Sequence, residues 1–524
     1  MTDEPLTLPV LLRRRAETDK DLPALVSEEA SITYGELDRQ SLRFAAWLVG
    51  QGVVKGSRVG LMKQNGVDWA VAALGAIRIG AVLVPLSTFL KPRELHQQLA
   101  IAAVTHLIIV EGFRGRDFVA ELAEAASGFD PATRRLQRAE DLPSLRAAWC
   151  WGDIKPASAD SAMTGMAEAL EARVRPSDDM AIIFTSGSRG APKGVIHTHG
   201  NALRAAGSSL EARRLGAGDR LYIPMPMFWV GGFSMGLISS MLAGATLLTE
   251  AQPEPARTLR FLEANKVTLF RGWPEQAAAL SRHPKFADAD LSTLKAGSLD
   301  AVLPLALRAR PGARSPLLGM TETFGPYSGA RLDQDMPMDA FGSCGRPFEG
   351  MEVRIVDPQS GAPCAVGETG VIQLRGPNLM RGICGRTREE VFTPDGFYAT
   401  GDLGRLDEKG YLYFAGRADD LFKVKGITVN PGEIESELRA APGVRLVLVV
   451  DVPVEGGAGA EVGAVVLLEK DASIDVAGLE AVARRSLSGF KAPTRWVLLR
   501  DDADIPVMAT GKVDKAGLRF LFKN

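Results

Sequence analysis

The sequence predicts an α/β protein built from several subdomains. The chain has 524 residues, which is more than one hydrophobic core usually serves. In its first half, short apolar segments alternate with longer amphipathic ones, the rhythm of largely parallel sheets covered by helices. From about residue 342 the strand candidates alternate apolar and polar residues instead, and after residue 425 the pattern is that of a small α+β domain.

The strand candidates of the first half are short apolar runs, at residues 58–63, 106–110, 180–184, 221–223, 245–248 and 267–270. An amphipathic helix is expected at residues 34–50, beginning near Thr33. The most membrane-like stretch, residues 71–90, contains Arg78 and Pro85. A buried helix running to Gly80 and then a strand therefore accounts for it better than a membrane span.

In the second half, half-exposed antiparallel strands are expected at residues 351–356 and 370–374. The C-terminal region should contain helices at residues 431–439 and 476–487. Two paired strands, at residues 446–450 and 462–468, should lie between these helices along the chain.

Composition excludes several classes of protein. A formal net charge of −2 gives no support for binding nucleic acid or an anionic membrane. The four cysteines, Cys150, Cys344, Cys364 and Cys384, form no CxxC pair, so neither a zinc site nor a disulfide framework is expected. Reduced thiols and the lack of a signal-peptide pattern at the N-terminus favour a cytoplasmic protein with no integral membrane segment.

The most informative segment is residues 184–194, Phe-Thr-Ser-Gly-Ser-Arg-Gly-Ala-Pro-Lys-Gly, which combine hydroxyl side chains, glycines and one lysine. A strand candidate precedes them, and a helix with its N-cap at Asn201 is expected after them. A strand, a glycine-rich loop and a helix together offer free backbone N–H groups to a phosphate. The alternative is an ordinary surface turn. The loop is not a Walker-type phosphate loop, because Pro192 stands at the second glycine position and Gly194, not a hydroxyl residue, follows Lys193.

Four further motifs each have an ordinary interpretation when taken alone. Residues 318–322 (Leu-Gly-Met-Thr-Glu), 398–402 (Tyr-Ala-Thr-Gly-Asp) and 416–420 (Gly-Arg-Ala-Asp-Asp) place carboxylates near glycine turns. Residues 510–514 (Thr-Gly-Lys-Val-Asp) contain a lysine near the C-terminus, where lysines are usually solvated.

In this order and at these spacings, the five motifs resemble those of the adenylate-forming superfamily. That superfamily comprises acyl-CoA synthetases, the adenylation domains of peptide synthetases and the beetle luciferases. The resemblance runs from residues 34–37 (Tyr-Gly-Glu-Leu) to Lys512, with finer matches at residues 345–347, 367–370 and 375–377. It implies a large N-terminal domain, residues 1–416, made of two doubly wound α/β subdomains and a distorted β-barrel. A hinge at residues 417–420 and a small mobile α+β domain, residues 421–524, would follow.

The resemblance implies a two-step reaction. A carboxylate attacks the α-phosphorus of ATP to give acyl-AMP and pyrophosphate, and a thiol, usually that of CoA, then displaces AMP. The implied nucleotide-binding residues are Thr185, Ser186, Gly187, Ser188, Gly190, Lys193, Leu318, Gly319, Thr321, Asp402, Arg417 and Lys512.

Within this set, Lys512, Thr321 and Glu322 match the catalytic positions. Lys512 would bridge the carboxylate and the α-phosphate, and Thr321 would touch that phosphate. Glu322 would hold Mg²⁺, which offsets the charge of the triphosphate. Asp402 would bind the ribose hydroxyls, with Arg417 beside it.

For the second step, Asp419 matches the hinge position and Gly426 the loop that lines the pantetheine tunnel. The implied acyl pocket contains Phe228, Trp229, Gly232, Gly297 and Gly319, with Gly231 and Gly232 expected to leave room. The partners implied are an acid, ATP and CoA, and a homodimer is one assembly open to such an enzyme.

Three positions depart from the family pattern. Arg189 replaces a usual Thr or Ser, and Leu318 replaces the aromatic residue that packs on adenine. Trp229 replaces a frequent His and would either shape the acyl pocket or pack in the core.

Residues 228–236 contain no acid to pair with an α-ammonium group, so an amino acid substrate is disfavoured. We expect an apolar fatty, aromatic or alicyclic acid, activated for CoA and used in a role such as fatty acid metabolism. Transfer to a carrier-protein thiol or an amine is the alternative within enzymes. A nucleotide-binding protein without catalysis is the alternative outside them.

Overall fold

The computed structural model describes residues 7–156, 161–185, 192–310, 312–424, 427–454, 460–487, 489, 491–507 and 513–522. The chain divides into two compact units. Unit 1 contains residues 1–352 and 375–398, and unit 2 contains residues 353–374 and 399–524. The hinge expected at residues 417–420 and the motion about it stay predictions.

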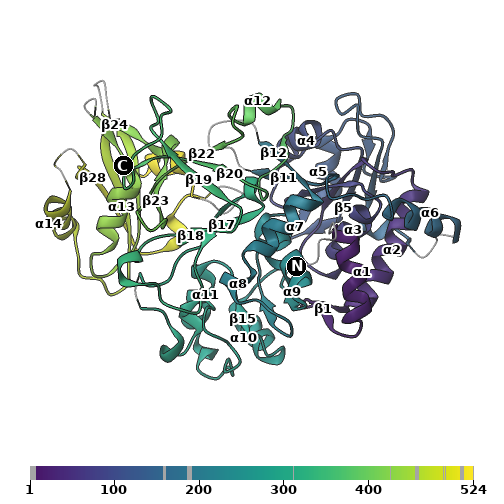
Figure 1. Ribbon diagram of the computed structural model, residues 1–524, viewed down its shortest axis with the longest axis horizontal. Helices are drawn as coiled ribbons and strands as arrows, with labels where there is room; N and C mark the ends of the chain where they lie inside the picture. The colour runs from purple at the N-terminus through teal and green to yellow at the C-terminus, as the bar shows by residue number, and fades with distance from the viewer. Residues whose placement is uncertain are drawn as a thin grey trace. The chain divides into compact units, whose positions relative to one another are not determined.

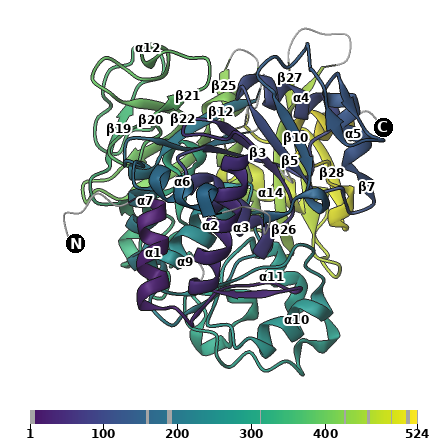
Figure 2. The same ribbon diagram turned by 90° about the vertical axis from the view of Figure 1, so that its right-hand side faces the viewer.

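A seven-stranded sheet forms one half of the α/β part of unit 1. In spatial order its strands are β10 (Ala147–Cys150), β5 (His106–Ile109), β3 (Arg58–Met62), β4 (Val82–Leu86), β11 (Asp179–Thr185), β12 (Lys193–Thr198) and β21 (Gly382–Ile383). The first five are parallel, whereas β12 and β21 add antiparallel pairings at one edge. Figure 2 shows β3, β5 and β10 side by side.

A five-stranded sheet forms the other half. Its order is β15 (Leu269–Phe270), β13 (Arg220–Tyr222), β14 (Thr246–Leu248), β1 (Pro23–Val26) and β2 (Ser31–Thr33). The first four strands are parallel, and β2 pairs antiparallel with β1. All six strand candidates of the first half are therefore confirmed, with boundaries shifted by one to two residues.

Helices cover both faces of each sheet, so the expectation of two doubly wound subdomains is confirmed. One apolar core joins the facing sides of the two sheets, with α1 (Leu8–Thr18), α2 (Tyr34–Gly50), α3 (Val67–Arg78) and α7 (His199–Ser208) in it (Figure 1). On the outer face of the seven-stranded sheet lie α4 (Pro92–Ile101) and α5 (Phe118–Ala125). On the outer face of the five-stranded sheet lie α10 (Pro255–Ala264) and α11 (Pro274–Ser281).

Unit 1 also contains α6 (Ser161–Glu171), α8 (Leu210–Arg213), α9 (Ser239–Ala243) and α12 (Arg388–Val391). Its three-stranded sheet has the order β16 (Leu318–Met320), β17 (Gly325–Gly329) and β18 (Arg346–Pro347). Two small hairpins, β6 (Gly112–Phe113) with β7 (Arg116–Asp117) and β8 (Phe129–Asp130) with β9 (Arg135–Leu136), complete it.

The helix expected at residues 34–50 is confirmed as α2. Its N-cap is Thr33, whose side chain accepts a hydrogen bond from Glu36 N. The apolar stretch at residues 71–90 divides into α3 and β4, as expected. Arg78 is buried at the end of α3, where it forms ion pairs with Glu171 and Asp38 at 2.9 and 2.7 Å. Across the described ranges, no helix combines the length and the apolar character needed to cross a membrane.

Unit 2 contains the expected α+β pattern. A four-stranded sheet has the order β19 (Glu352–Val356), β20 (Gly370–Arg375), β22 (Tyr398–Leu406) and β23 (Leu412–Arg417). Its strand-end residues Glu352, Arg375 and Tyr398 are counted with unit 1. After the β24 (Phe422–Val424) and β25 (Ile427–Val429) hairpin come α13 (Pro431–Arg439), β26 (Val444–Pro453), β27 (Ala460–Leu468), α14 (Val476–Ser486), β28 (Arg495–Leu499) and α15 (Lys515–Phe520). The paired strands are confirmed as the antiparallel β26 and β27.

Candidate active site

The strands on either side of the glycine-rich loop pair with each other, which corrects one expectation. The segment was expected to lead from a strand directly into a helix, but β12 intervenes and pairs antiparallel with β11, with Thr185 opposite Lys193. Lys193 therefore begins a strand and is half-buried. Ser186, Gly187, Ser188, Arg189 and Gly190 lie outside the described residues, so their phosphate-binding role stays a prediction.

The helix after β12 begins three residues earlier than expected. Thr198, not Asn201, is the N-cap of α7, and its hydroxyl accepts a hydrogen bond from Asn201 N. Asn201 reciprocates, because its Oδ1 accepts from Thr198 N at 2.6 Å. Both residues have short polar side chains that favour caps, and the reciprocal pair is a capping box with Asn at its third position.

The motif at residues 318–322 forms a tight turn between two strands. Leu318 and Gly319 lie in β16, and Thr321 and Glu322 lie in a 3₁₀ turn (Thr321–Thr323) that leads to β17. Gly319 is needed for the close approach of these strands, since a Cβ there would lie 2.5 Å from Gly325 O. The turn ends at Phe324, a buried residue with a left-handed φ of 52°.

Glu322 is buried, with 6% of its surface exposed, and is held from two sides. Tyr398 donates its hydroxyl hydrogen to Glu322 Oε1 at 3.0 Å, and Met380 N donates to Glu322 O at 2.8 Å. No group of three metal-ligating side chains occurs in the part of the chain that the structure describes. A single carboxylate still suits Mg²⁺, which usually takes one or two carboxylates with phosphate oxygens and water.

His197, on β12, contacts the backbone of the same turn. Its Nε2 lies 2.8 Å from Thr321 O and its Nδ1 lies 2.8 Å from Asn201 Nδ2. Complete burial lowers the pKa of His197 to about 3, because the charged ring would lose its hydration. Neither His197 nor Tyr398 was selected from the sequence. Tyr398 stands inside the motif at residues 398–402, which was the available signal, whereas nothing local marks His197.

Asp402 and Arg417 lie opposite each other on β22 and β23 of unit 2. Arg417 Nη1 donates to Asp402 Oδ1 at 2.8 Å, and Asp402 is largely buried, with 7% of its surface exposed. Asp402 N donates to Thr400 Oγ1 at 3.0 Å, which fixes the turn at Gly401. The arrangement presents a carboxylate whose charge is partly offset by a guanidinium.

The implied acyl segment carries an aromatic cluster of Phe89, Phe228, Trp229 and Trp273. Trp229 is half-buried, with ring centroids 5.2 Å from Phe228 and 6.3 Å from Trp273, while Phe89 lies 5.9 Å from Phe228. Trp273 is 38% exposed and Phe228 is buried. Trp229 is thus the middle of a chain of rings that runs from the interior to the surface, not a core residue.

Gly231 and Gly232 were expected to leave room in the acyl pocket, but the space next to them is occupied. They begin a π-helix, η3 (Gly231–Ile238), and the Cβ directions of both are filled by the chain itself. A Cβ on Gly232 would meet the carbonyl oxygens of Pro226 and Met225. Gly297, another implied pocket residue, has a φ of +90°, and a Cβ there would lie 3.1 Å from Leu332 O. Backbone packing requires glycine at position 232, and the positive φ favours glycine at position 297. The contact of these glycines with an acid stays a prediction.

Lys512 and Gly426 lie outside the described residues, as does the side chain of Asp419. Their roles stay predictions.

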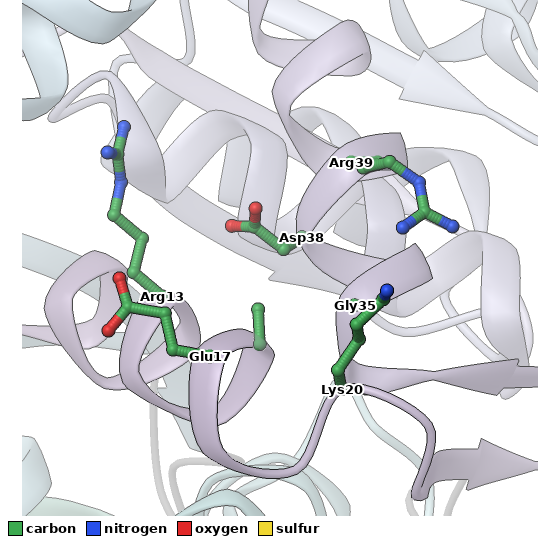
Figure 3. A pocket seen from close by; sticks show the side chains of 7 residues that line it. Arg13, Glu17, Lys20, Gly35, Asp38 and Arg39 are labelled. Carbon is green, nitrogen blue, oxygen red and sulfur yellow. The ribbon is translucent and has the colours of Figure 1, made fainter.

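A surface hollow of about 250 Å³ between α1 and α2 contains none of the predicted site residues. Figure 3 shows Arg13 and Glu17 of α1 and Asp38 and Arg39 of α2 around it. Arg13 bonds to Glu171 and Asp38 bonds to Arg78, so these two charges serve the packing of helices.

The fold and the sequence motifs define an adenylate-forming enzyme, and comparison with known proteins agrees. A family model described as AMP-binding enzyme matches residues 12–384. The chain is 32% identical to 3-[(3aS,4S,7aS)-7a-methyl-1,5-dioxo-octahydro-1H-inden-4-yl]propanoyl:CoA ligase of Mycobacterium tuberculosis, over 99% of this chain and 100% of that protein. It is 30% identical to 3-hydroxybenzoate–CoA ligase of Aromatoleum sp., over 96% and 94%.

Solved structures of related enzymes match the fold of this chain. The crystal structure of ATP-bound MatB from Rhodopseudomonas palustris matches with a TM-score of 0.78 and 26% identity, over 99% of each chain. The anthranilate CoA ligase AuaEII in complex with anthranoyl-AMP matches with a TM-score of 0.79 at 23% identity, over 99% of this chain and 97% of that one. This chain therefore belongs to the AMP-binding enzyme family.

Proposed function

We propose that this protein is an ATP-dependent acyl-CoA ligase. It converts an apolar carboxylic acid into acyl-AMP with release of pyrophosphate, and then transfers the acyl group to CoA with release of AMP. The observation that supports this most strongly is the turn at Thr321 and Glu322, in a chain whose full length resembles named CoA ligases. The buried Glu322 carboxylate, oriented by Tyr398, is suited to a cation that also binds phosphate oxygens.

The charges of the reactants define what the other residues have to do. An acid and a triphosphate repel each other, so the first step needs positive charge and hydrogen-bond donors around the phosphates. Lys512 would supply charge at the α-phosphate, and Thr185, Lys193 and the loop between them would hold the β- and γ-phosphates. Bound Mg²⁺ would neutralise phosphate charge next to Glu322. Asp402, partly offset by Arg417, would accept the ribose hydroxyls.

The aromatic cluster supports an acid that contains rings. Phe228, Trp229 and Trp273 offer flat apolar faces, and no carboxylate lies in residues 228–236 to bind an amino group. The relatives named above act on a fused-ring acid and on 3-hydroxybenzoate. We therefore favour an aromatic or alicyclic acid over a straight-chain one. A role in fatty acid metabolism, a cytoplasmic location and a homodimer stay predictions.

The test is a panel of acids with pyrophosphate release as the readout, run with and without CoA. The panel contains benzoates, cinnamates, fused-ring propanoates, straight-chain acids and amino acids. Mass spectrometry then identifies acyl-AMP and the thioester. Pyrophosphate release with a ring-containing acid and a CoA thioester supports the proposal. Acyl-AMP without any thioester would instead favour a carrier-protein thiol or an amine as acceptor, and no ATP turnover with any acid would refute the adenylating function.

Lys512 gives a second prediction. Lys512→Ala should lower adenylation at least about 100-fold, because the positive charge between two anions is lost. The variant should still convert supplied acyl-AMP and CoA to thioester at a rate close to that of the unaltered protein. Both half-reactions are measured separately, and unchanged rates in both would rule out the assigned role.

A further inference from the structure

His197 is a buried histidine that the proposed reaction does not use directly. It lies on β12 with none of its surface exposed, 124 residues along the chain from Thr321. The carbonyl oxygen of Thr321 can only accept a hydrogen bond, so His197 Nε2 carries the hydrogen and donates it over 2.8 Å. Asn201 Nδ2 is a donor, so His197 Nδ1 accepts from it. A neutral ring satisfies both contacts.

The ring is held in place by groups that are themselves fixed. The Oδ1 atom of Asn201 accepts from Thr198 N in the capping box of α7, which aims its Nδ2 at the ring. The ring of Phe324 lies 4.7 Å from the ring of His197, centroid to centroid. A chain of hydrogen bonds thus runs from the first turn of α7, through His197, to the Thr321 carbonyl.

The Thr321 carbonyl belongs to the peptide that joins Thr321 to Glu322. Because a peptide is planar, holding this oxygen fixes the direction in which the chain enters Glu322. Met380 N holds the next carbonyl and Tyr398 holds the carboxylate, so the turn is anchored at three successive points. Without His197, the Thr321–Glu322 peptide would lose one of these three anchors, next to the residue proposed to touch phosphate. A displacement of about 1 Å at such a point can cost about 100-fold in rate.

We propose that His197 is a positioning residue that holds the Thr321–Glu322 peptide in the orientation needed for Mg²⁺–ATP. The inference rests on the proposed function for the roles of Thr321 and Glu322. His197 lies outside the five sequence motifs, so none of them includes this residue.

The first test compares His197→Leu with His197→Gln. Leucine keeps the apolar volume and loses both hydrogen bonds, whereas the amide of glutamine can still donate to Thr321 O. We expect His197→Leu to weaken binding of Mg²⁺ with a non-hydrolysable ATP analogue about tenfold by calorimetry. It should also lower kcat for acid-dependent pyrophosphate release about 10- to 100-fold, with the KM for the acid within about twofold. His197→Gln should recover most of both.

The matched control is His106→Leu. His106 is also buried, on β5 of the same sheet, where it bonds to Thr105 and stacks on Trp149. Its loss should lower Tm without changing binding of the ATP analogue. Equal weakening in His106→Leu and His197→Leu, or unchanged binding in a folded His197→Leu, would overturn the proposal.

A second pair of variants tests the proposal if His197→Leu does not fold. Asn201→Ala and Thr198→Ala both remove the capping box of α7, but only Asn201→Ala frees the ring of His197. Weaker binding of the ATP analogue in Asn201→Ala alone supports the proposal, and equal effects in both variants contradict it. Binding of the ATP analogue is measured without turnover. If the unaltered protein binds Mg²⁺–ATP but turns over no acid, the proposed function is refuted, and the role of His197 in binding can still be tested.

Discussion

At the scale of single residues, the candidate site depends on side chains that orient other side chains. Glu322 is a buried carboxylate, and Tyr398 and Met380 keep it and its carbonyl in place. Asp402 depends in the same way on Arg417. Thr321, Glu322, Asp402 and Arg417 were selected from contiguous motifs. Tyr398 lies 76 residues from Glu322 along the chain, so its partner was not evident from local spacing.

Tyr398→Phe tests the orientation of Glu322. The variant removes one hydrogen bond to Oε1 and keeps the ring that packs near Phe392. We expect the Mg²⁺ concentration for half-maximal pyrophosphate release to rise about three- to tenfold, with a stability loss of about 1 kcal/mol.

Tyr34→Phe is the control for that prediction, because the buried hydroxyl of Tyr34 bonds to Ala245 O and Ser240 O away from these motifs. It should cost similar stability without changing the Mg²⁺ requirement. A shift of the same size in both variants would contradict a specific role for Tyr398.

At the scale of elements, the helices and strands that hydrophobic periodicity predicted are present in the structure, because each buries apolar residues in a core. Periodicity missed β12, where Gly194 and Thr198 interrupt the apolar run and pairing with β11 and β21 makes the strand. It also gave no sign of the π-helix η3. A π-helical turn is uncommon and often marks a functional segment, and here it contains the implied acyl residue Gly232.

Gly232→Ala should be strongly destabilising, by about 3 kcal/mol or more, because the new Cβ would meet the Met225 and Pro226 carbonyls. Gly165→Ala is the matched comparison: Gly165 lies inside α6, and nothing stands within 4 Å of its Cβ direction. There alanine should stabilise by about 0.5–1 kcal/mol, since it favours the helix. Urea unfolding measures both, and equal effects at the two sites would contradict the packing argument.

At the scale of the whole molecule, buried histidines should set the response to acid. Desolvation lowers the pKa of His106 to about 4 and that of His199 to about 4. The folded state keeps these rings neutral, whereas the unfolded chain takes up protons below about pH 6.5. Their stabilising contribution is therefore present above pH 6.5 and is lost progressively as the pH falls towards 4.

The prediction is that the free energy of unfolding falls between pH 6.5 and 4.5, by up to about 1.4 kcal/mol per pH unit for each such histidine. Glu250 opposes this trend, because burial raises the pKa of its carboxyl and favours the protonated form as the pH falls. His106→Gln should make the decline shallower. Urea titrations at several pH values measure the slope, and an unchanged slope in the variant would show that His106 does not contribute.

The sequence by itself determined the family, the α/β class and the candidate residues whose chemistry lies in contiguous motifs. Such motifs can be recognised in the sequence because their glycine, turn residues and charged group are only a few residues apart and come together in one local turn. The tertiary structure alone decided that the strands flanking the glycine-rich loop pair antiparallel, that Gly232 is required by backbone packing, and that Tyr398 and His197 meet the turn at Glu322. Those contacts join residues far apart in the chain, so they exist only once sheet pairing and core packing have brought the segments together.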